Sequence, residues 1–287
     1  IGLLDTSQDE VDRVLNTLLD AGVNVIDTAA YYKGSERMIG NAVAHRRDQF
    51  VLVSKCGTRL TDETDAAAFS PELITYTVDR ALRNLRTDHL DVMLLHSCDL
   101  ATLQKGDALG ALIKTRDAGK VRHAGYAGDN DAAAWAAANP GIAVIETSVS
   151  VTDQANMDSV LPVARKHNVG VIAKRPIANA AWKDMNDQPE FFRAYTRPYV
   201  DRFQKMQLNL SDFGYDPADP AAWLDLFLRF TMSADGVHTA IVGTTKEHSA
   251  RQNLEIADRG PLPPDAVRKV REAFRRADPA GAWKGET

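Results

Sequence analysis

The stretch Phe50-Val51-Leu52-Val53 shows the pattern that decides the fold. It is short, apolar and rich in β-branched residues, and it lacks the polar and apolar alternation of a strand with one solvated face. Strands that are buried on both faces, as in parallel sheets, have this composition. Six further runs are similar, at residues 23–26, 90–95, 121–125, 143–146, 170–173 and 239–242.

The segments between these runs have the patterns of amphipathic helices. Residues 7–10, Ser-Gln-Asp-Glu, match a capping box, and apolar residues follow at helical spacing. Ser70 and Pro71 supply a cap and a first-turn proline for another helix. Gly22 and Gly119 lie where helices must end before the next strand. Further helices are predicted at residues 131–138, 157–167, 222–232 and 247–257.

Seven alternations of strand and helix predict an α/β protein with a parallel sheet. An open, doubly wound sheet is one solution, but no G-x-G-x-x-G motif follows a strand to mark it. The number and size of the units favour a (β/α)8 barrel, or TIM barrel, formed by a single domain over residues 1–287. One strand of such a barrel is then missing, and we expect it to precede Ile1.

The composition is that of an ordinary globular protein. Of the 287 residues, 44% are hydrophobic, enough for a large core, and the formal net charge is −5. No Lys/Arg-rich run is present to follow a nucleic acid, and no apolar stretch is long enough to span a bilayer. Cys56 and Cys98 provide neither a disulfide framework nor zinc spacing. We expect buried thiols, with a redox switch as the open alternative, in a cytoplasmic protein without metal, nucleic-acid or membrane partners.

Residues 179–219 form an insertion ahead of the predicted helix at 222–232. Three prolines interrupt it, and a loop at the C-terminal face of a barrel can form a wall of the substrate pocket. Packing of its aromatic side chains into a satellite core is an equally good interpretation. These aromatic residues are Trp182, Phe191, Phe192, Tyr195, Tyr199, Phe203, Phe213 and Tyr215.

Ionisable residues follow three consecutive predicted strands. Asp27 and Tyr32 follow the first, Lys55 follows the second and His96 follows the third. Each alone is explained by a cap or a solvated side chain, but strand ends of a barrel meet at the face that carries active sites. An ammonium lowers the pKa of a nearby phenol, a carboxylate holds the ammonium in place, and a histidine can donate a hydrogen bond to a carbonyl oxygen. The set suits protonation of an alkoxide formed by hydride delivery, and the hydride requires a cofactor.

Residues 24–32, Asn-Val-Ile-Asp-Thr-Ala-Ala-Tyr-Tyr, followed by Gly-Ser-Glu at 34–36, resemble the signature of the aldo-keto reductase family. In that signature the tyrosine lies five residues after the aspartate, which selects Tyr32 over Tyr31. Residues 50–55 and 91–97 resemble the family's lysine and histidine strands, and the similarity extends to about residue 257. The resemblance implies a TIM barrel that binds NAD(P)H without a Rossmann fold. It implies Asp27, Tyr32, Lys55 and His96 as the catalytic residues.

The resemblance also implies a place for the adenosine end of the cofactor. In the family, the loop after the last strand and the start of the next helix hold it. Lys246 is then the preferred contact to a 2′-phosphate, which favours NADPH over NADH, unless Lys246 is only a surface residue of the first turn. The residues implied at this end are Gly243, Thr244, Thr245, Lys246, Ser249, Gln252 and Asn253.

Three positions depart from the family's usual nicotinamide contacts. Residues 127–129, Ala-Gly-Asp, stand where the family has Ser-Asn, and Glu146 stands where it has glutamine. Lys174 stands where the family has an aromatic residue that stacks on the nicotinamide. Glu146, Lys174 and Arg175 are candidate cofactor contacts at these positions. Lys174 and Arg175 could face the cofactor pyrophosphate or an anionic substrate, or could pair with local acids such as Glu146.

The sequence thus predicts an NADPH-dependent oxidoreductase that reduces small aldehydes or ketones to alcohols, or catalyses the reverse. One alternative is a cofactor-binding regulatory subunit with little turnover, like the potassium-channel β subunits that share the scaffold. Another is a barrel lyase or isomerase that binds a phosphorylated sugar through Lys174 and Arg175. The natural substrate and the oligomeric state stay open.

Overall fold

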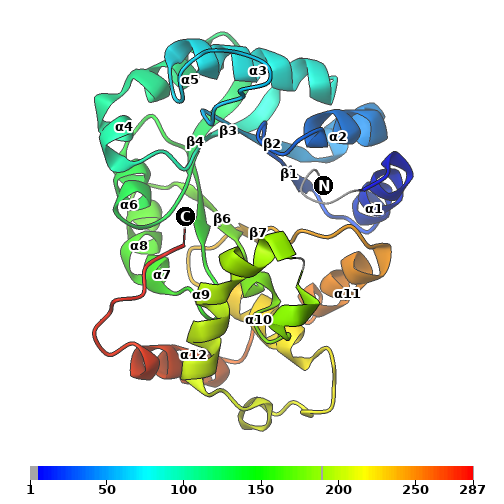
Figure 1. Ribbon diagram of the computed structural model, residues 1–287, viewed down its shortest axis with the longest axis vertical. Coiled ribbons are helices and arrows are strands. Elements are labelled where there is room, and N and C mark those ends of the chain that lie inside the picture. The colour runs from blue at the N-terminus through cyan, green and yellow to red at the C-terminus, as the bar shows by residue number, and fades with distance from the viewer. Residues whose placement is uncertain (1–5, 189, 287) are drawn as a thin grey trace.

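The computed structural model describes residues 6–188 and 190–286, and seven parallel strands form its central sheet (Figure 1). The strands are hydrogen-bonded in sequence order, so each strand lies between its neighbours along the chain. This is the order in a (β/α)8 barrel, and the predicted fold is confirmed. The strands are β1 (Val25–Asp27), β2 (Val51–Cys56), β3 (Leu90–His96), β4 (Val121–Ala127), β5 (Val144–Ser148), β6 (Gly170–Lys174) and β7 (Thr239–Ala240).

Helices connect successive strands and surround the sheet (Figure 1). The first seven are α1 (Gln8–Asp20), α2 (Ser35–Val43), α3 (Pro71–Leu85), α4 (Leu100–Lys105), α5 (Asp107–Asp117), α6 (Asn130–Ala138) and α7 (Ala155–Ser159). The others are α8 (Leu161–Lys166), α9 (Glu190–Met206), α10 (Ala222–Met232), α11 (Glu247–Ala257) and α12 (Pro264–Ala277). Short 3₁₀ helices lie at Ala44–Gln49, Ala178–Ala180, Met185–Asp187 and Leu210–Phe213.

The strand predicted before Ile1 lies outside the described residues and stays a prediction. β1 and β7 form no ladder with each other among the residues that the structure describes. In the same part of the chain, no helix is long and apolar enough to cross a membrane.

All seven predicted strands are present, and their ends differ from the predicted ones by at most three residues. The predicted caps also form: the Ser7 side chain accepts a hydrogen bond from the amide of Glu10 in a complete capping box, and Ser70 caps α3. Gly22 and Gly119 have φ values of +87° and +78°, which explains why glycine ends these helical segments.

Two helix predictions require correction. The single helix expected at 157–167 is divided into α7 and α8 at Val160, and Pro162 in the first turn of α8 has no amide to continue a hydrogen-bond ladder from α7. Pro198 does not interrupt the insertion, because it lies inside the 17-residue helix α9. The helix α12 was not anticipated, and it packs against α9.

The aromatic residues of the insertion divide between the two predicted roles. Tyr199 is fully buried in a second core cluster, in which Trp182 and Phe203 pack against Phe227 of α10. Other aromatic side chains of the insertion line a cavity described below. The satellite-core interpretation is confirmed for Trp182, Tyr199 and Phe203, and a wall of the substrate pocket formed by the others stays a prediction.

Gly40 and Gly110 provide a test of the packing between helices. A Cβ atom on Gly40 of α2 would lie 2.2 Å from the carbonyl oxygen of Asn84, whereas a Cβ atom on Gly110 of α5 would meet nothing within 4 Å. We expect Gly40→Ala to lower the free energy of unfolding by about 1–3 kcal/mol, because the α2 and α3 backbones must separate. Gly110→Ala should raise it by about 0.5–1 kcal/mol through helix propensity. Urea denaturation would measure both, and equal effects would contradict this account.

Candidate active site

The inward-facing side chains of the strands determine which residues meet inside the barrel. Apolar residues from several strands form a small inner cluster, and a residue two places further along a strand faces the same side. Each predicted site residue within a strand lies two positions after a residue of the inner cluster on the same strand. These site residues therefore lie directly above the inner cluster. The inner residue and its site residue are Val25 and Asp27, Val53 and Lys55, Leu94 and His96, Val144 and Glu146, and Ile172 and Lys174.

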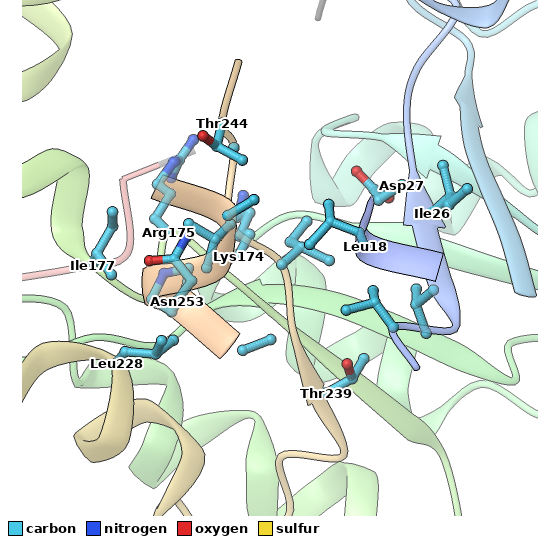
Figure 2. Close-up of a pocket in the computed structure, with 18 of the residues that line it drawn as sticks. Leu18, Ile26, Asp27, Lys174, Arg175, Ile177, Leu228, Thr239, Thr244 and Asn253 are labelled. Atoms are coloured by element: carbon cyan, nitrogen blue, oxygen red, sulfur yellow. The ribbon is translucent and has the colours of Figure 1, made fainter. Parts of the chain in front are cut away.

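A cavity of about 1070 Å³ opens where these strands end. Asp27, Tyr32 and His96 line it together with the start of α11 and two aromatic residues of α9, Phe192 and Tyr195. Lys174 and Arg175 lie across the cavity from Asp27 (Figure 2). Part of the cavity extends between β1 and β7, which form no ladder with each other among the described residues.

Lys55 is the centre of the site, with 1% of its surface exposed. Its ammonium donates to Asp27 Oδ1 at 2.5 Å and to the carbonyl oxygen of Thr28 at 3.0 Å. Glu146 Oε2 lies 3.2 Å from the same nitrogen and forms a second ion pair. A buried cation requires such partners, since unpaired charge in the interior is very costly.

Tyr32 and His96 lie directly beside this ammonium. The Lys55 Nζ atom is 5.7 Å from the centroid of the Tyr32 ring, and the Tyr32 and His96 rings meet edge to face with centroids 6.1 Å apart. Tyr31, in contrast, is 57% exposed. The structure therefore brings the four predicted catalytic residues into one cluster and separates Tyr31 from it.

Burial governs the protonation states of this cluster. It raises the pKa of Tyr32 above the usual value, and although Lys55 opposes this, the sequence-based expectation of a lowered phenol pKa is not met. Burial and the Lys55 charge lower the pKa of His96 to about 4, so its ring is neutral at pH 7. Burial also acts to lower the pKa of Lys55, but Asp27 and Glu146 outweigh it and the pKa is raised.

Two carboxyl groups thus face one ammonium. Burial, followed by the charge of Glu146, raises the pKa of Asp27 well above its usual range. Asp27 Oδ2 and Glu146 Oε2 are buried and accept no hydrogen bond of good geometry among the described residues, although Glu146 Oε2 lies 3.2 Å from the Lys55 ammonium. We infer that the pair holds one proton, because two buried carboxylates that share a site do not both ionise readily.

Lys174 and Arg175 form a second charged group around Asp129, which has no exposed side-chain surface. Lys174 Nζ lies 3.1 Å and Arg175 Nη1 lies 3.8 Å from Asp129 Oδ2. Arg175 also donates to Ser148 Oγ at 3.0 Å. The partner acid is therefore Asp129 and not the suggested Glu146, which lies within ion-pair distance of Lys55.

Most of the predicted adenosine-end residues line the same cavity. Lys246 is the N-cap of α11, and its amide donates to Thr244 Oγ1 at 3.2 Å. Gln252 is half-buried and does not line the cavity. The residues that do line it are Gly243, Thr244, Thr245, Lys246, Ser249 and Asn253.

Sequence reasoning missed the importance of Asp129 and Tyr195. Asp129 lies two residues after Ala127, a member of the inner cluster, so the spacing that selects Lys55 from Val53 also selects Asp129. Its carboxylate accepts hydrogen bonds from the Ser148 amide at 2.7 Å and from the Thr147 hydroxyl at 2.8 Å. No comparable spacing points to Tyr195, because α9 lies outside the βα repeat.

The two cysteines are buried thiols, as favoured from the sequence. Burial raises the pKa of Cys98 to about 12 and raises that of Cys56 as well. Neither thiol ionises readily at neutral pH, and thiolate is the reactive form.

The arrangement agrees with comparisons to known proteins. The model of the "Aldo/keto reductase family" matches residues 3–275. An uncharacterized oxidoreductase of Bacillus subtilis, YqkF, is 22% identical over 276 residues, covering 93% of this chain and 88% of the relative.

Solved structures show the same fold. The holo form of aldo-keto reductase AKR11C1 from Bacillus halodurans superposes with a TM-score of 0.77 at 21% identity, covering 94% of this chain and 89% of that one. An aldo-keto reductase from Klebsiella pneumoniae in complex with NADPH gives a TM-score of 0.68 at 22% identity, with 96% and 88% covered. The match to the family model extends over nearly the whole chain. The chain therefore belongs to the aldo/keto reductase family of oxidoreductases.

Proposed function

We propose that this chain is an NADPH-dependent carbonyl reductase in which Tyr32 exchanges a proton with the carbonyl oxygen of the substrate. The observation that supports this best is the cluster of Tyr32, Lys55, Asp27 and His96 beside a cavity that continues to Lys246. An acid/base group and a cofactor-sized space thus adjoin each other. We infer that residues 1–287 act as one domain, since the cavity is lined by elements from α1 to α11.

The donors along the cavity fit a dinucleotide phosphate. The Lys246 ammonium and the free amides in the first turn of α11 suit a 2′-phosphate, and Asn253 offers hydrogen bonds to adenine. Glu146, Lys174 and Arg175 line the same cavity, and the nicotinamide is proposed to lie beside them. The NADPH complex of the Klebsiella pneumoniae relative supports the same cofactor for this chain. When bound, NADPH supplies the hydride for the carbonyl carbon.

The side chains of the cluster take complementary parts in proton transfer. Tyr32 donates its phenolic proton to the carbonyl oxygen as negative charge develops there. Lys55, 5.7 Å from the ring centroid, stabilises the phenolate that remains, and Asp27 and Glu146 hold the ammonium in place. The neutral ring of His96 donates a hydrogen bond that polarises the same oxygen.

A regulatory, cofactor-binding role is the second candidate, favoured by the changed nicotinamide contacts at residues 127–129 and at Lys174. The two roles differ in a single turnover. Mixing the NADPH-loaded protein with a panel of aldehydes and ketones should oxidise the bound cofactor if the chain is a reductase. Retention of NADPH with every carbonyl compound would favour the regulatory role.

Tyr32→Phe removes the proposed proton donor. We expect kcat for carbonyl reduction to fall by about 10²–10⁴-fold, while the Kd for NADPH changes little. Tyr31→Phe is the matched control, because the neighbouring ring is exposed and should leave kcat unchanged. Steady-state kinetics and fluorescence titration of NADPH would measure both effects. Normal turnover in the Tyr32 variant would remove this residue from the proton-donor role.

Lys246→Ala tests the phosphate contact. We expect the Kd for NADPH to rise about 10-fold or more, and the Kd for NADH to change little, because a charge-assisted hydrogen bond to the 2′-phosphate is lost. Lys105→Ala on α4 is the control, since this exposed lysine does not line the cavity. Equal losses for the two cofactors would argue against the contact.

Glu146→Gln tests the shared proton. With the second carboxylate removed, the pKa of Asp27 should fall, and the infrared C=O band of a protonated carboxyl at pH 7 should disappear. Asp153→Asn should remove a separate band, because the pKa of that buried carboxyl is raised to about 7.

Glu146→Gln should also change how the free energy of unfolding depends on pH. The folded wild type keeps a proton that the unfolded chain releases above about pH 4, so its free energy of unfolding should fall as pH rises. The slope is at most about 1.4 kcal/mol per pH unit for one proton. Glu146→Gln should flatten this dependence. An unchanged slope and an unchanged band would show that the pair holds no proton.

A further inference from the structure

We propose that Lys174 and Arg175 bind a carboxylate on the carbonyl substrate, so that the preferred substrates are aldehydes or ketones that also carry a carboxylate. This inference rests on the proposed reductase function and specifies its substrate class. It is carried by three features of the cavity wall: an excess of positive charge, unused hydrogen-bond donors and a strained backbone that presents Arg175.

The charge excess follows from the ion pairs. Lys174 and Arg175 share a single carboxylate, that of Asp129, at 3.1 Å and 3.8 Å. Asp129 is not among the residues that line the cavity, whereas both cations are. Two positive charges therefore face the cavity with one negative charge behind them. A bound carboxylate would balance the group, and interior charges require such balance.

The remaining acids nearby do not supply this balance. Glu146 acts on Lys174 electrostatically, but it forms its ion pair with the Lys55 ammonium, 3.2 Å away. Asp153 acts on Arg175 electrostatically, but burial raises the pKa of Asp153 to about 7, so at neutral pH its charge is only partly developed. The other groups that surround the pair are His96, Tyr195, Tyr199 and Arg202, and none of these is an anion at neutral pH.

Lys174 and Arg175 also have hydrogen-bond donors with which they could bind a carboxylate. Only 8% of the Lys174 surface is exposed, and burial lowers the pKa of its ammonium although Asp129 opposes the effect. Arg175 presents five N–H groups, and among the described residues its side-chain partners are the Ser148 hydroxyl, Asp129 and Tyr195. A guanidinium of this kind can bind a carboxylate through two parallel hydrogen bonds.

The backbone at Arg175 has a strained conformation. Its φ is +56°, in the left-handed region that residues with a Cβ atom seldom adopt, and Ala178, Asn179 and Ala180 share that conformation. The strained segment begins directly after β6 and lines the cavity at Arg175 and Asn179. Such strain persists where the surrounding structure enforces it, which is common at ligand sites.

The position of Arg175 favours the substrate over the cofactor phosphates. Its guanidinium carbon lies 4.9 Å from the centroid of the Tyr195 ring on α9, and its hydroxyl partner Ser148 ends β5. Tyr195 is close enough to Tyr32 to influence the pKa of that phenol. Arg175 is therefore linked to the acid/base cluster through the α9 wall.

The test compares aldehydes that differ by one carboxylate. Benzaldehyde and its 2-, 3- and 4-carboxy derivatives would be reduced with NADPH, and we expect at least one carboxylated aldehyde to exceed benzaldehyde in kcat/KM by about 10-fold or more. Arg175→Met should bring that ratio close to one, mainly through KM. Arg175→Lys should retain part of it, because the charge is kept. Arg197→Met is the matched control: this arginine is exposed on α9, does not line the cavity and should leave the ratio unchanged.

Three results would overturn the inference. A wild-type ratio near one for all three acids would show that no carboxylate is recognised. If Arg175→Met lowers kcat/KM equally for all the aldehydes and raises the Kd for NADPH, the side chain instead contacts the cofactor pyrophosphate. If no aldehyde oxidises NADPH at all, the proposed reductase function fails, and the inference that rests on it fails as well.

Discussion

The burial of the Lys55 ammonium is the constraint on which the site depends. A charge with 1% exposure persists only because strands from both sides bring carboxyl groups to it, Asp27 on β1 and Glu146 on β5. Those carboxyl groups must be buried in turn, and burial, followed by the charge of Glu146, raises the pKa of Asp27 well above its usual range. Tyr32 and His96 lie against this group. The protonation states of these acid/base residues therefore depend on how the charge of Lys55 is buried and paired.

Much of this arrangement was predictable because a parallel barrel has few degrees of freedom. Strands buried on both faces are apolar almost throughout, so polar residues at their C-terminal ends stand out, as Lys55 and His96 do. The period of two along a strand then fixes which of these residues face inward. The features that the sequence did not predict also have a physical reason. Pro198 inside α9 and the division of α7 from α8 depend on tertiary packing, which local helix propensity does not encode.

The charged group of Lys174, Arg175 and Asp129 was harder to predict, because its residues and their neighbours come from elements that no common sequence periodicity relates. Lys174 and Arg175 were identified only as departures from a family pattern, and their pairing with Asp129 required the relative placement of β4 and β6. Tyr195, which stacks on Arg175, belongs to an insertion outside the βα repeat. Sequence periodicity locates residues on a strand, but contacts between an insertion and the barrel depend on packing.

The departures from the usual nicotinamide contacts are linked to one another. Asp129 belongs to the segment that stands where the family has Ser-Asn, Lys174 replaces the stacking aromatic residue, and the two form an ion pair at 3.1 Å with almost no exposure. Replacing Asp129 alone with an uncharged residue would leave the buried Lys174 ammonium without its carboxylate partner, which costs about 3–5 kcal/mol. The Lys174 ammonium therefore depends on Asp129, and together with Arg175 it acts on the acid/base group by helping to lower the pKa of His96, after burial and the charge of Lys55.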